Sequence, residues 1–225
     1  MSRVRSAAGG GKSVEVTADR IVGWFARFTE RHQNVRSVEL STERLQVEAV
    51  DGATASAAVP FAPLLLEAPV TDLDSAVGLL VEHLARPRLI GLVLVRLGGH
   101  SIGIARGGTV LASTTDHLPV HGRNKAGGWS QQRFARRRVG QARVAVQHAA
   151  ADVRRVLGPR VGELSAVVLG GDPRVLAALR AEPGLAEVFA LAQSRVLDVP
   201  EPRRTVLDEA AKRVLGLEIL VREPD

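Results

Sequence analysis

The first part of the chain carries one clear helical pattern. Residues 1–13 are basic and Gly-rich and show no hydrophobic periodicity, so we expect a disordered tail there. From Thr17 onward, apolar residues recur at helical spacing and charged residues fill the opposite face. The apolar face consists of Ile21, Val22, Phe25 and Phe28. This pattern predicts an amphipathic helix.

Short strands and a second helix follow. Apolar runs predict three strands, over residues 35–40, 45–50 and 55–59, and Asp51-Gly52 supplies a turn between two of them. A helix is then expected from about Asp72 to Ala85, with Thr71 or Asp72 as its cap and Pro87 beyond its end. We therefore predict a small α+β domain over residues 14–86.

The second half begins with a continuous aliphatic run, Leu89–Leu97, which is typical of a central buried strand. The pairs Gly98-Gly99 and Gly107-Gly108 separate it from strands expected over residues 101–106 and 109–115. Two-residue glycine turns between apolar runs indicate hairpins. The pattern thus predicts a three-stranded antiparallel meander.

A long helix is expected after the meander, from Ser130 to Leu157, where Gly158-Pro159 stops it. The remaining pattern alternates strand and helix, with Asp172 capping the first of these helices. The expected ranges are 164–169, 173–180, 195–199 and 203–214, and residues 217–221 form either a last strand or a docked tail. This order is that of a ribonuclease H-like mixed sheet, so we predict an α/β domain (α+β for the whole chain) over residues 88–225.

Composition excludes several kinds of site. The chain has no cysteine, which rules out disulfides, thiolate zinc sites and cysteine nucleophiles. No apolar run approaches the roughly 18–20 residues that span a bilayer, and the N-terminal stretch lacks the apolar core of a secretory signal. The six histidines show no metal-binding spacing. We therefore expect a cytoplasmic protein without membrane contact, metal or cofactor.

Positive charge is concentrated in one segment. Between Asp116 and Asp152 there is no acidic residue, but there are seven basic ones: Arg123, Lys125, Arg133, Arg136, Arg137, Arg138 and Arg143. Without these seven, the chain has 23 basic residues against 24 acidic ones. A solvated surface face is one interpretation, but such faces normally mix both signs of charge. An uncompensated arginine cluster favours contact with phosphates of nucleic acid.

The expected long helix separates this charge from its apolar positions. On an ideal helix, Arg133, Arg136, Arg137 and Arg143 fall within about 120° of one another. The opposite side carries Ala135, Val139, Ala142, Val146, Val153 and Leu157. We therefore expect one face to pack on the sheet and the other to form an arginine stripe.

A motif with a known counterpart lies inside the basic segment. Residues 125–138 read Lys-Ala-Gly-Gly-Trp-Ser-Gln-Gln-Arg-Phe-Ala-Arg-Arg-Arg. The stretch resembles the catalytic loop and helix of eukaryotic and archaeal class-one translation release factors. The matching positions are Gly127, Gly128, Ser130, Arg133, Phe134, Ala135 and Arg136. Trp129 stands where that family has its catalytic glutamine, and the resulting Gly-Gly-x-x-Gln form is similar to the Vms-type branch, in its actinobacterial version.

The resemblance implies a fold and an activity. Residues 88–225 would correspond to the release-factor middle domain, with the Gly-Gly-x-x-Gln loop and the long basic helix. The activity would be codon-independent hydrolysis of peptidyl-tRNA on stalled large ribosomal subunits, as in ribosome rescue and ribosome-associated quality control. The codon-reading Asn-Ile-Lys-Ser and Tyr-Cys motifs are absent. The partners would be the large subunit, peptidyl-tRNA and ribosomal RNA, contacted by a monomer.

The same resemblance assigns roles to residues. Gln131 would act in catalysis with Gly127 and Gly128, while Trp129, Ser130 and Gln132 would support the loop. RNA would be bound by Arg123, Lys125, Arg133, Arg136, Arg137 and Arg143. Gln132 remains an alternative to Gln131, and Trp129 either stacks on a base or packs the loop against the domain.

Two other functions compete with this one. A ribonuclease H-like nuclease would need carboxylates on the central strands to hold metal ions, yet the expected strands at 89–97 and 164–169 carry none. Only Asp116 and Asp172 could then serve as ligands. A non-catalytic RNA-binding protein would use the same arginines, with Gly127-Gly128 as a simple hinge.

Overall fold

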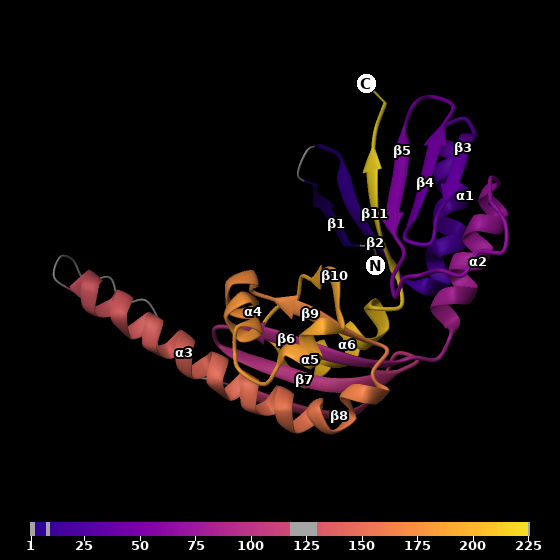
Figure 1. The fold of residues 1–225 in the computed structure, drawn as a ribbon. Coiled ribbons are helices and arrows are strands. Elements are labelled where there is room, and N and C mark those ends of the chain that lie inside the picture. Colours follow the sequence, from indigo (N-terminus) through magenta and orange to yellow (C-terminus); the bar gives the residue numbers. More distant parts are fainter. Residues whose placement is uncertain (1–2, 8–9, 118–129, 225) are drawn as a thin grey trace. The chain divides into compact units, whose positions relative to one another are not determined.

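The computed structural model describes residues 3–7, 10–117 and 130–224, and within the long helix it describes no side chains at 130–139 or 141–142. The chain divides into two compact units. The first unit comprises Met1–Pro87 together with Lys212–Asp225, and the second unit comprises Arg88–Ala211. Figure 1 labels their helices and strands.

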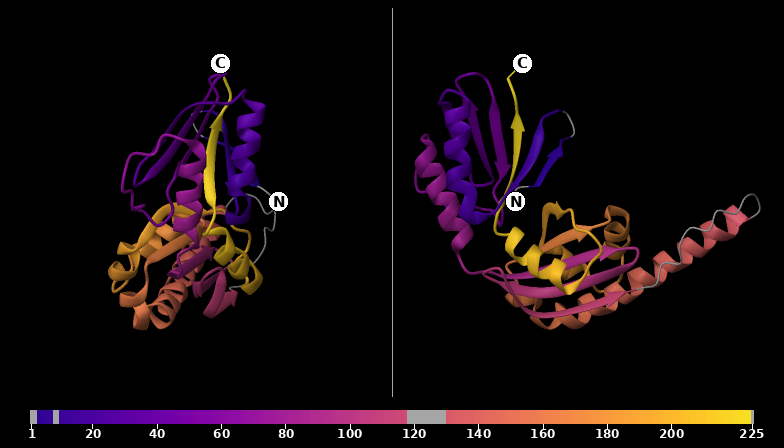
Figure 2. Two further views of the ribbon diagram at one scale, coloured as in Figure 1. Left: turned by 90° about the vertical axis from the view of Figure 1, so that its right-hand side faces the viewer. Right: turned by 180° about the vertical axis from the view of Figure 1, so that it is seen from behind.

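The first unit is built on a six-stranded antiparallel sheet of order β1-β2-β11-β5-β4-β3. Its strands are β1 (Arg3–Ser6), β2 (Lys12–Val16), β3 (Val35–Leu40), β4 (Arg44–Ala49), β5 (Thr54–Ala58) and β11 (Leu217–Arg222). A short 3-10 helix, η1 (Ala18–Arg20), leads into α1 (Ile21–Arg31), and α2 (Leu73–Ala85) follows β5. Both α-helices lie on the same face of this sheet (Figure 2).

Local sequence signals account for most of the first unit. Asp72 caps α2 as expected, since its Oδ1 accepts a hydrogen bond from the backbone N–H of Ser75 at 2.8 Å. The apolar face of α1 was predicted correctly except at one position. Ile21, Phe25 and Phe28 are buried, but Val22 is 61% exposed, because it lies one residue off the buried stripe.

The N-terminal residues differ from the expectation. Within the expected tail at 1–13, the structure forms β1 and the start of β2. These strands pair with each other, and β2 pairs with β11, about 200 residues away in sequence. The prediction of disorder was wrong there because the backbone partners of β2 come from the other end of the chain.

The last strand also corrects the expected domain boundary. β11 lies between β2 and β5 and is antiparallel to both. The segment before β11 lies close to β2. Gly216 approaches the carbonyl oxygen of Val16 so closely that a Cβ there would collide with it, and the buried guanidinium of Arg213 donates to Glu15 at 2.6 and 2.8 Å. The domain expected over residues 88–225 therefore ends near Ala211, and the residues after it complete the first unit.

The second unit contains a mixed five-stranded sheet of order β10-β9-β6-β7-β8. Its strands are β6 (Leu89–Arg96), β7 (Gly99–Arg106), β8 (Thr109–His117), β9 (Ala166–Gly171) and β10 (Ala192–Leu197). β6, β7 and β8 form the antiparallel meander, while β9 is parallel to β6 and to β10. The expected ribonuclease H-like arrangement is confirmed, with the aliphatic β6 at its centre.

Helices cover both faces of this mixed sheet. They are α3 (Ser130–Val156), α4 (Pro173–Arg180), α5 (Ala186–Ala190) and α6 (Arg204–Arg213), with the 3-10 helix η2 (Gly158–Glu163) after α3. α3, α4 and α5 share one core with the alternate residues Val93 and Val95 of β6. α6 packs on the opposite face, where a Cβ at Gly103 of β7 would lie 2.8 Å from Cδ2 of Leu207, so that the leucine would have to shift.

Candidate functional site

Five of the seven basic residues of this segment belong to the N-terminal half of α3, and Arg123 and Lys125 precede it in the sequence. In Figure 1 this half of the helix extends beyond the strands of the sheet. Because α3 begins at Ser130, Gln131 and Gln132 belong to its first turn. The predicted glutamine thus lies at a helix start, three residues after Gly128 in the sequence.

Several predicted site residues lie outside the described residues. They are Arg123, Lys125, Gly127, Gly128 and Trp129. For Ser130, Gln131, Gln132, Arg133, Arg136 and Arg137, the structure describes the helical backbone only. Arg143 is described fully, and its side chain is exposed on α3, as a member of the expected stripe should be.

The other half of α3 is fixed to the sheet by small and aliphatic side chains. The buried residues are Ala145, Val146, Ala149, Ala150, Val153 and, just beyond the helix, Leu157. They recur three and four residues apart, which defines a single helix face. Val146, Val153 and Leu157 were predicted to face the sheet, and they do. Alanine at the remaining positions allows the helix to approach the strands closely.

A buried polar contact adds to this packing. His100 of β7 is completely buried, and its Nε2 lies 2.7 Å from Oδ2 of Asp152 on α3. The guanidinium of Arg155 donates to the other oxygen, Oδ1, at 2.7 and 3.2 Å. Burial raises the pKa of Asp152, but the hydrogen bonds from His100 and Arg155 outweigh it, and the net pKa is lowered.

A second polar contact joins α3 to the end of β8. Nδ1 of His148 lies 3.3 Å from Oδ2 of Asp116, and both side chains are about half exposed. Asp116 is next to His117, the last residue of β8. The two strands beneath the helix, β7 and β8, therefore each make a histidine–aspartate contact with it.

The start of α3 has the electrostatic character of an anion site. The first four N–H groups of a helix have no acceptor inside the helix, so the backbone N–H of Gln131 is not used by the helix itself. The helix dipole makes this end positive, and the first turn contains no acidic residue. Arginines at this end repel the dipole, and a bound anion would offset that repulsion.

The structure gives no support to a two-metal nuclease. Asp172 caps α4, since its Oδ1 accepts from the N–H of Arg174 at 2.8 Å and of Val175 at 3.4 Å. The carboxylate of Asp116 is in contact with the ring of His148. Among residues 3–7, 10–117 and 130–224, no three histidine or acidic side chains are grouped so that they could hold a metal ion.

The histidine–aspartate contacts were not predicted from the sequence. Their partners are 52 and 32 residues apart and belong to different elements, so no local motif links them. The sequence did contain one signal: Asp116 and Asp152 are the acidic residues immediately before and after the basic segment. Each of them pairs with a histidine across the contact between α3 and the sheet.

Residues 88–220 match the model of the Actinobacteria/chloroflexi VLRF1 release factor family, acVLRF1. The chain belongs to this family. The resemblance drawn from residues 125–138 is thereby confirmed, and the match runs through the second unit and into β11. Membership places the protein among the release factors, and its function is therefore in translation, at the ribosome.

A comparison with solved structures matches the chain to two archaeal proteins, among others. The archaeal translation termination factor aRF1 is 12% identical with a TM-score of 0.39, covering 87% of this chain and 69% of its own. Pelota from Archaeoglobus fulgidus is 11% identical with a TM-score of 0.34, covering 96% of this chain and 66% of its own. No curated relative matches the chain. Within the described residues, no helix is both long and apolar enough to cross a membrane.

Proposed function

We propose that the protein hydrolyses peptidyl-tRNA on stalled large ribosomal subunits without reading a codon, in ribosome rescue or ribosome-associated quality control. The observation that carries the proposal is the position of Gln131. It lies in the first turn of α3, three residues after Gly128 in sequence, in a chain of the VLRF1 release factor family. The protein would act in the cytoplasm as a monomer, with the large subunit, peptidyl-tRNA and ribosomal RNA as partners.

The proposed reaction is attack of water on the ester carbonyl that joins the nascent peptide to the terminal ribose of tRNA. The bond between the carbonyl carbon and the ribose oxygen breaks, so the peptide leaves as a carboxylic acid and the tRNA regains its hydroxyl. Gln131 would orient the water with its side-chain amide and stabilise the developing oxyanion with its backbone N–H. Orientation can supply up to roughly 7–11 kcal/mol, and one oxyanion donor about 3–4 kcal/mol.

The residue types fit a site lined with RNA. A carboxylate would be repelled by phosphates, whereas an amide carries no charge. Gly127 and Gly128 allow the backbone to approach RNA without a side-chain clash. Arg123, Lys125, Arg133, Arg136, Arg137 and Arg143 would hold ribosomal RNA or the acceptor end of the tRNA. The proposal assigns the general base to the RNA or to the substrate.

The test is peptide release from isolated large subunits that carry a stalled nascent chain. We expect wild-type protein to free the peptide, and Gln131→Ala to bind equally well but release at least about tenfold more slowly. Gln132→Ala is the matched control, since it removes the neighbouring amide from the same helical turn.

Four outcomes would contradict the proposal. Normal release by Gln131→Ala would remove that residue from the mechanism, and slow release by Gln132→Ala alone would transfer its role. Binding without any release would indicate a non-catalytic RNA-binding protein. RNA cleavage that stops in EDTA would indicate a nuclease.

A further inference from the structure

A cavity of about 320 Å³ in the first unit lies between α1 and the strands β1, β2 and β11. We call it the α1 pocket. The helix lines it with Trp24, Arg27, Phe28 and Arg31, which are spaced three and four residues apart and so share one helix face. β2 contributes Lys12 and Val14, and β11 contributes Val221. The volume lies within the usual range of ligand sites, roughly 300–1,000 Å³.

The helix side of the pocket presents a rigid aromatic surface. The ring of Trp24 is half-buried and stacks on the buried ring of Phe28, with centroids 5.6 Å apart and planes 14° from parallel. Phe25 meets Trp24 edge-on at 4.9 Å. These contacts hold the indole in place while part of it stays accessible. An aromatic ring that is ordered before binding is a suitable platform for stacking a nucleobase.

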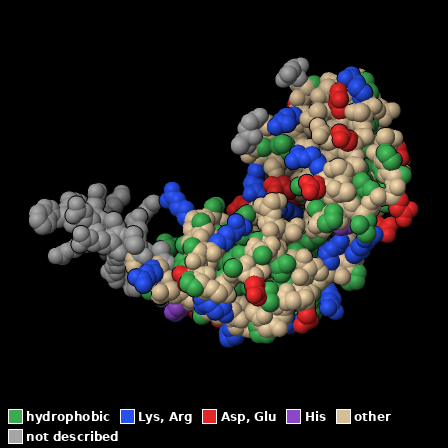
Figure 3. Space-filling model, viewed as in Figure 1, with side chains coloured by type: hydrophobic (Ala, Val, Ile, Leu, Met, Phe, Trp, Pro, Cys, Tyr) green, Lys and Arg blue, Asp and Glu red, His purple; other side chains and the backbone are tan. Residues whose placement is uncertain are grey.

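The cations around this surface are uncompensated. Lys12, Arg27 and Arg31 are exposed, and none has an ion-pair partner among the described residues. Two other exposed arginines of the first unit do have one: Arg36 pairs with Glu48 at 2.9 Å, and Arg86 with Glu82 at 3.8 Å. On the side of this unit seen in Figure 3, acidic and basic side chains are likewise interleaved. Unpaired cations beside an aromatic ring attract a polyanion.

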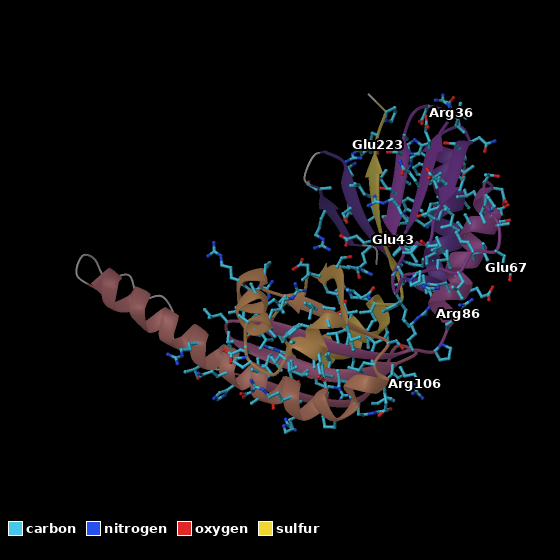
Figure 4. The ribbon with its side chains drawn as sticks, viewed as in Figure 1. Arg36, Glu43, Glu67, Arg86, Arg106 and Glu223 are labelled. Atoms are coloured by element: carbon cyan, nitrogen blue, oxygen red, sulfur yellow. The ribbon has the colours of Figure 1, made fainter. Side chains whose placement is uncertain are left out.

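The described residues that line the pocket include one carboxylate. Glu223, labelled in Figure 4, follows β11, and its Oε2 lies 4.0 Å from Nε2 of His32. The other ring nitrogen of His32 lies 2.8 Å from Asp51, so this imidazole has an acidic group on both sides. A single acceptor among three cations suits a ligand that combines phosphates with amino or imino donors, as a nucleotide does.

We propose that the α1 pocket binds single-stranded RNA, with a base against Trp24 and neighbouring phosphates on Arg27, Arg31 and Lys12. This site is separate from α3 and its arginines, and it does not depend on the chemistry assigned to Gln131. The protein would therefore contact RNA through both units. An acidic polypeptide would satisfy the cations but would leave the aromatic platform without a stacking partner.

Intrinsic fluorescence of the full chain can test the proposal, because the sequence contains only two tryptophans, Trp24 and Trp129. In Trp129→Phe, all tryptophan emission comes from the pocket. We expect a single-stranded oligouridine to change this emission saturably. Adding Arg27→Ala and Arg31→Ala should weaken that binding and reduce its salt slope by roughly 0.7 for each phosphate that the variant no longer neutralises.

The matched control is Arg36→Ala with Arg86→Ala, added to Trp129→Phe. It removes the same charge from the same unit but away from the pocket, and we expect RNA binding near Trp24 to change little. Arg27 and Arg31 are exposed, so their replacement should leave the urea unfolding curve unchanged. An unchanged curve excludes misfolding as the cause of weaker binding.

Three results would overturn the inference: no RNA-dependent change at Trp24, equal weakening by the control pair, or an equal response to polyglutamate. The last would identify a site for acidic polypeptides. RNA binding that leaves the emission of Trp24 unchanged would place the contact elsewhere, for example on α3. The proposed release activity would stand in each of these cases, because peptide release is measured separately.

Discussion

The two halves of α3 serve opposite purposes, although they are one continuous helix. From Ala145 onward, α3 packs small and aliphatic side chains on the sheet and adds the contacts His100–Asp152 and His148–Asp116. From Ser130 to Arg143 it carries a series of arginines with no acidic residue between them. Packing on the sheet explains the sequence of the C-terminal half. The arginine-rich composition of the N-terminal half indicates that it binds an anionic partner.

The comparison shows how a functional segment can depend on a remote anchor. A helix of 27 residues is about 40 Å long, so a small tilt at one end moves the other end by several ångströms. The buried half fixes the direction of the helix, and with it the position of Gln131. Packing defects near Ala149 should therefore affect release as well as stability.

The largest effect is expected from a charge in the anchoring half. Ala149 is fully buried against the sheet, so Ala149→Asp places an unpaired carboxylate in the core. We expect a loss of about 3–5 kcal/mol in the free energy of unfolding, measured with urea. Gln147→Asp, on the exposed side of the same helix, is the control. Similar losses for both variants would contradict the assigned packing face.

A smaller effect on stability is expected when the polar contact between β7 and α3 is weakened. Asp152→Asn replaces a carboxylate that accepts hydrogen bonds from His100 and Arg155, which should cost about 1.5–3 kcal/mol at pH 7. Glu187→Gln, at an exposed carboxylate of the same unit, should change stability by less than about 0.5 kcal/mol.

The pH dependence gives a second measurement of the same contact. Because folding lowers the pKa of Asp152, its stabilisation is complete above the unfolded pKa of about 3.9 and is lost as the pH falls through the lower folded value. The difference in unfolding free energy between wild type and Asp152→Asn should therefore shrink as the pH falls below about 5 and through the lowered pKa of Asp152. A difference independent of pH would show that ionisation of Asp152 contributes nothing.

The smallest effect is expected in the exposed half. Arg136→Ala with Arg137→Ala should leave stability nearly unchanged but reduce the salt slope of RNA binding by roughly 0.7–0.9 for each phosphate that these arginines neutralise in the wild type. Arg160→Ala with Arg174→Ala removes the same charge elsewhere in the second unit. An unchanged slope in the α3 variant would show that these two arginines touch no phosphate.

Local signals were sufficient for much of the fold. Glycine pairs marked the hairpins of the β6–β8 meander, Asp72 and Asp172 marked the starts of α2 and α4, and the apolar spacing marked the buried face of α3. The functional segment was found through residues 125–138, whose match to the release factors does not require any knowledge of the fold. Short α5 was missed, since five residues carry little periodicity.

The remaining features depend on contacts between distant parts of the chain. β1 and β2 carry too few apolar residues to signal strands. They become strands because β2 pairs with β11 and β1 pairs with β2. His100 and Asp152 likewise meet only after β7 and α3 have packed together. Such contacts are decided by the tertiary structure and leave no pattern in a sequence window.

The position of β11 has a consequence for the order in which the chain folds during its own synthesis. A nascent chain that has emerged as far as Ala211 contains every segment of the second unit, yet the gap between β2 and β5 is still open. The unit that is translated first is therefore completed last. Until then, β2 and β5 each expose an unpaired edge that another polypeptide could occupy.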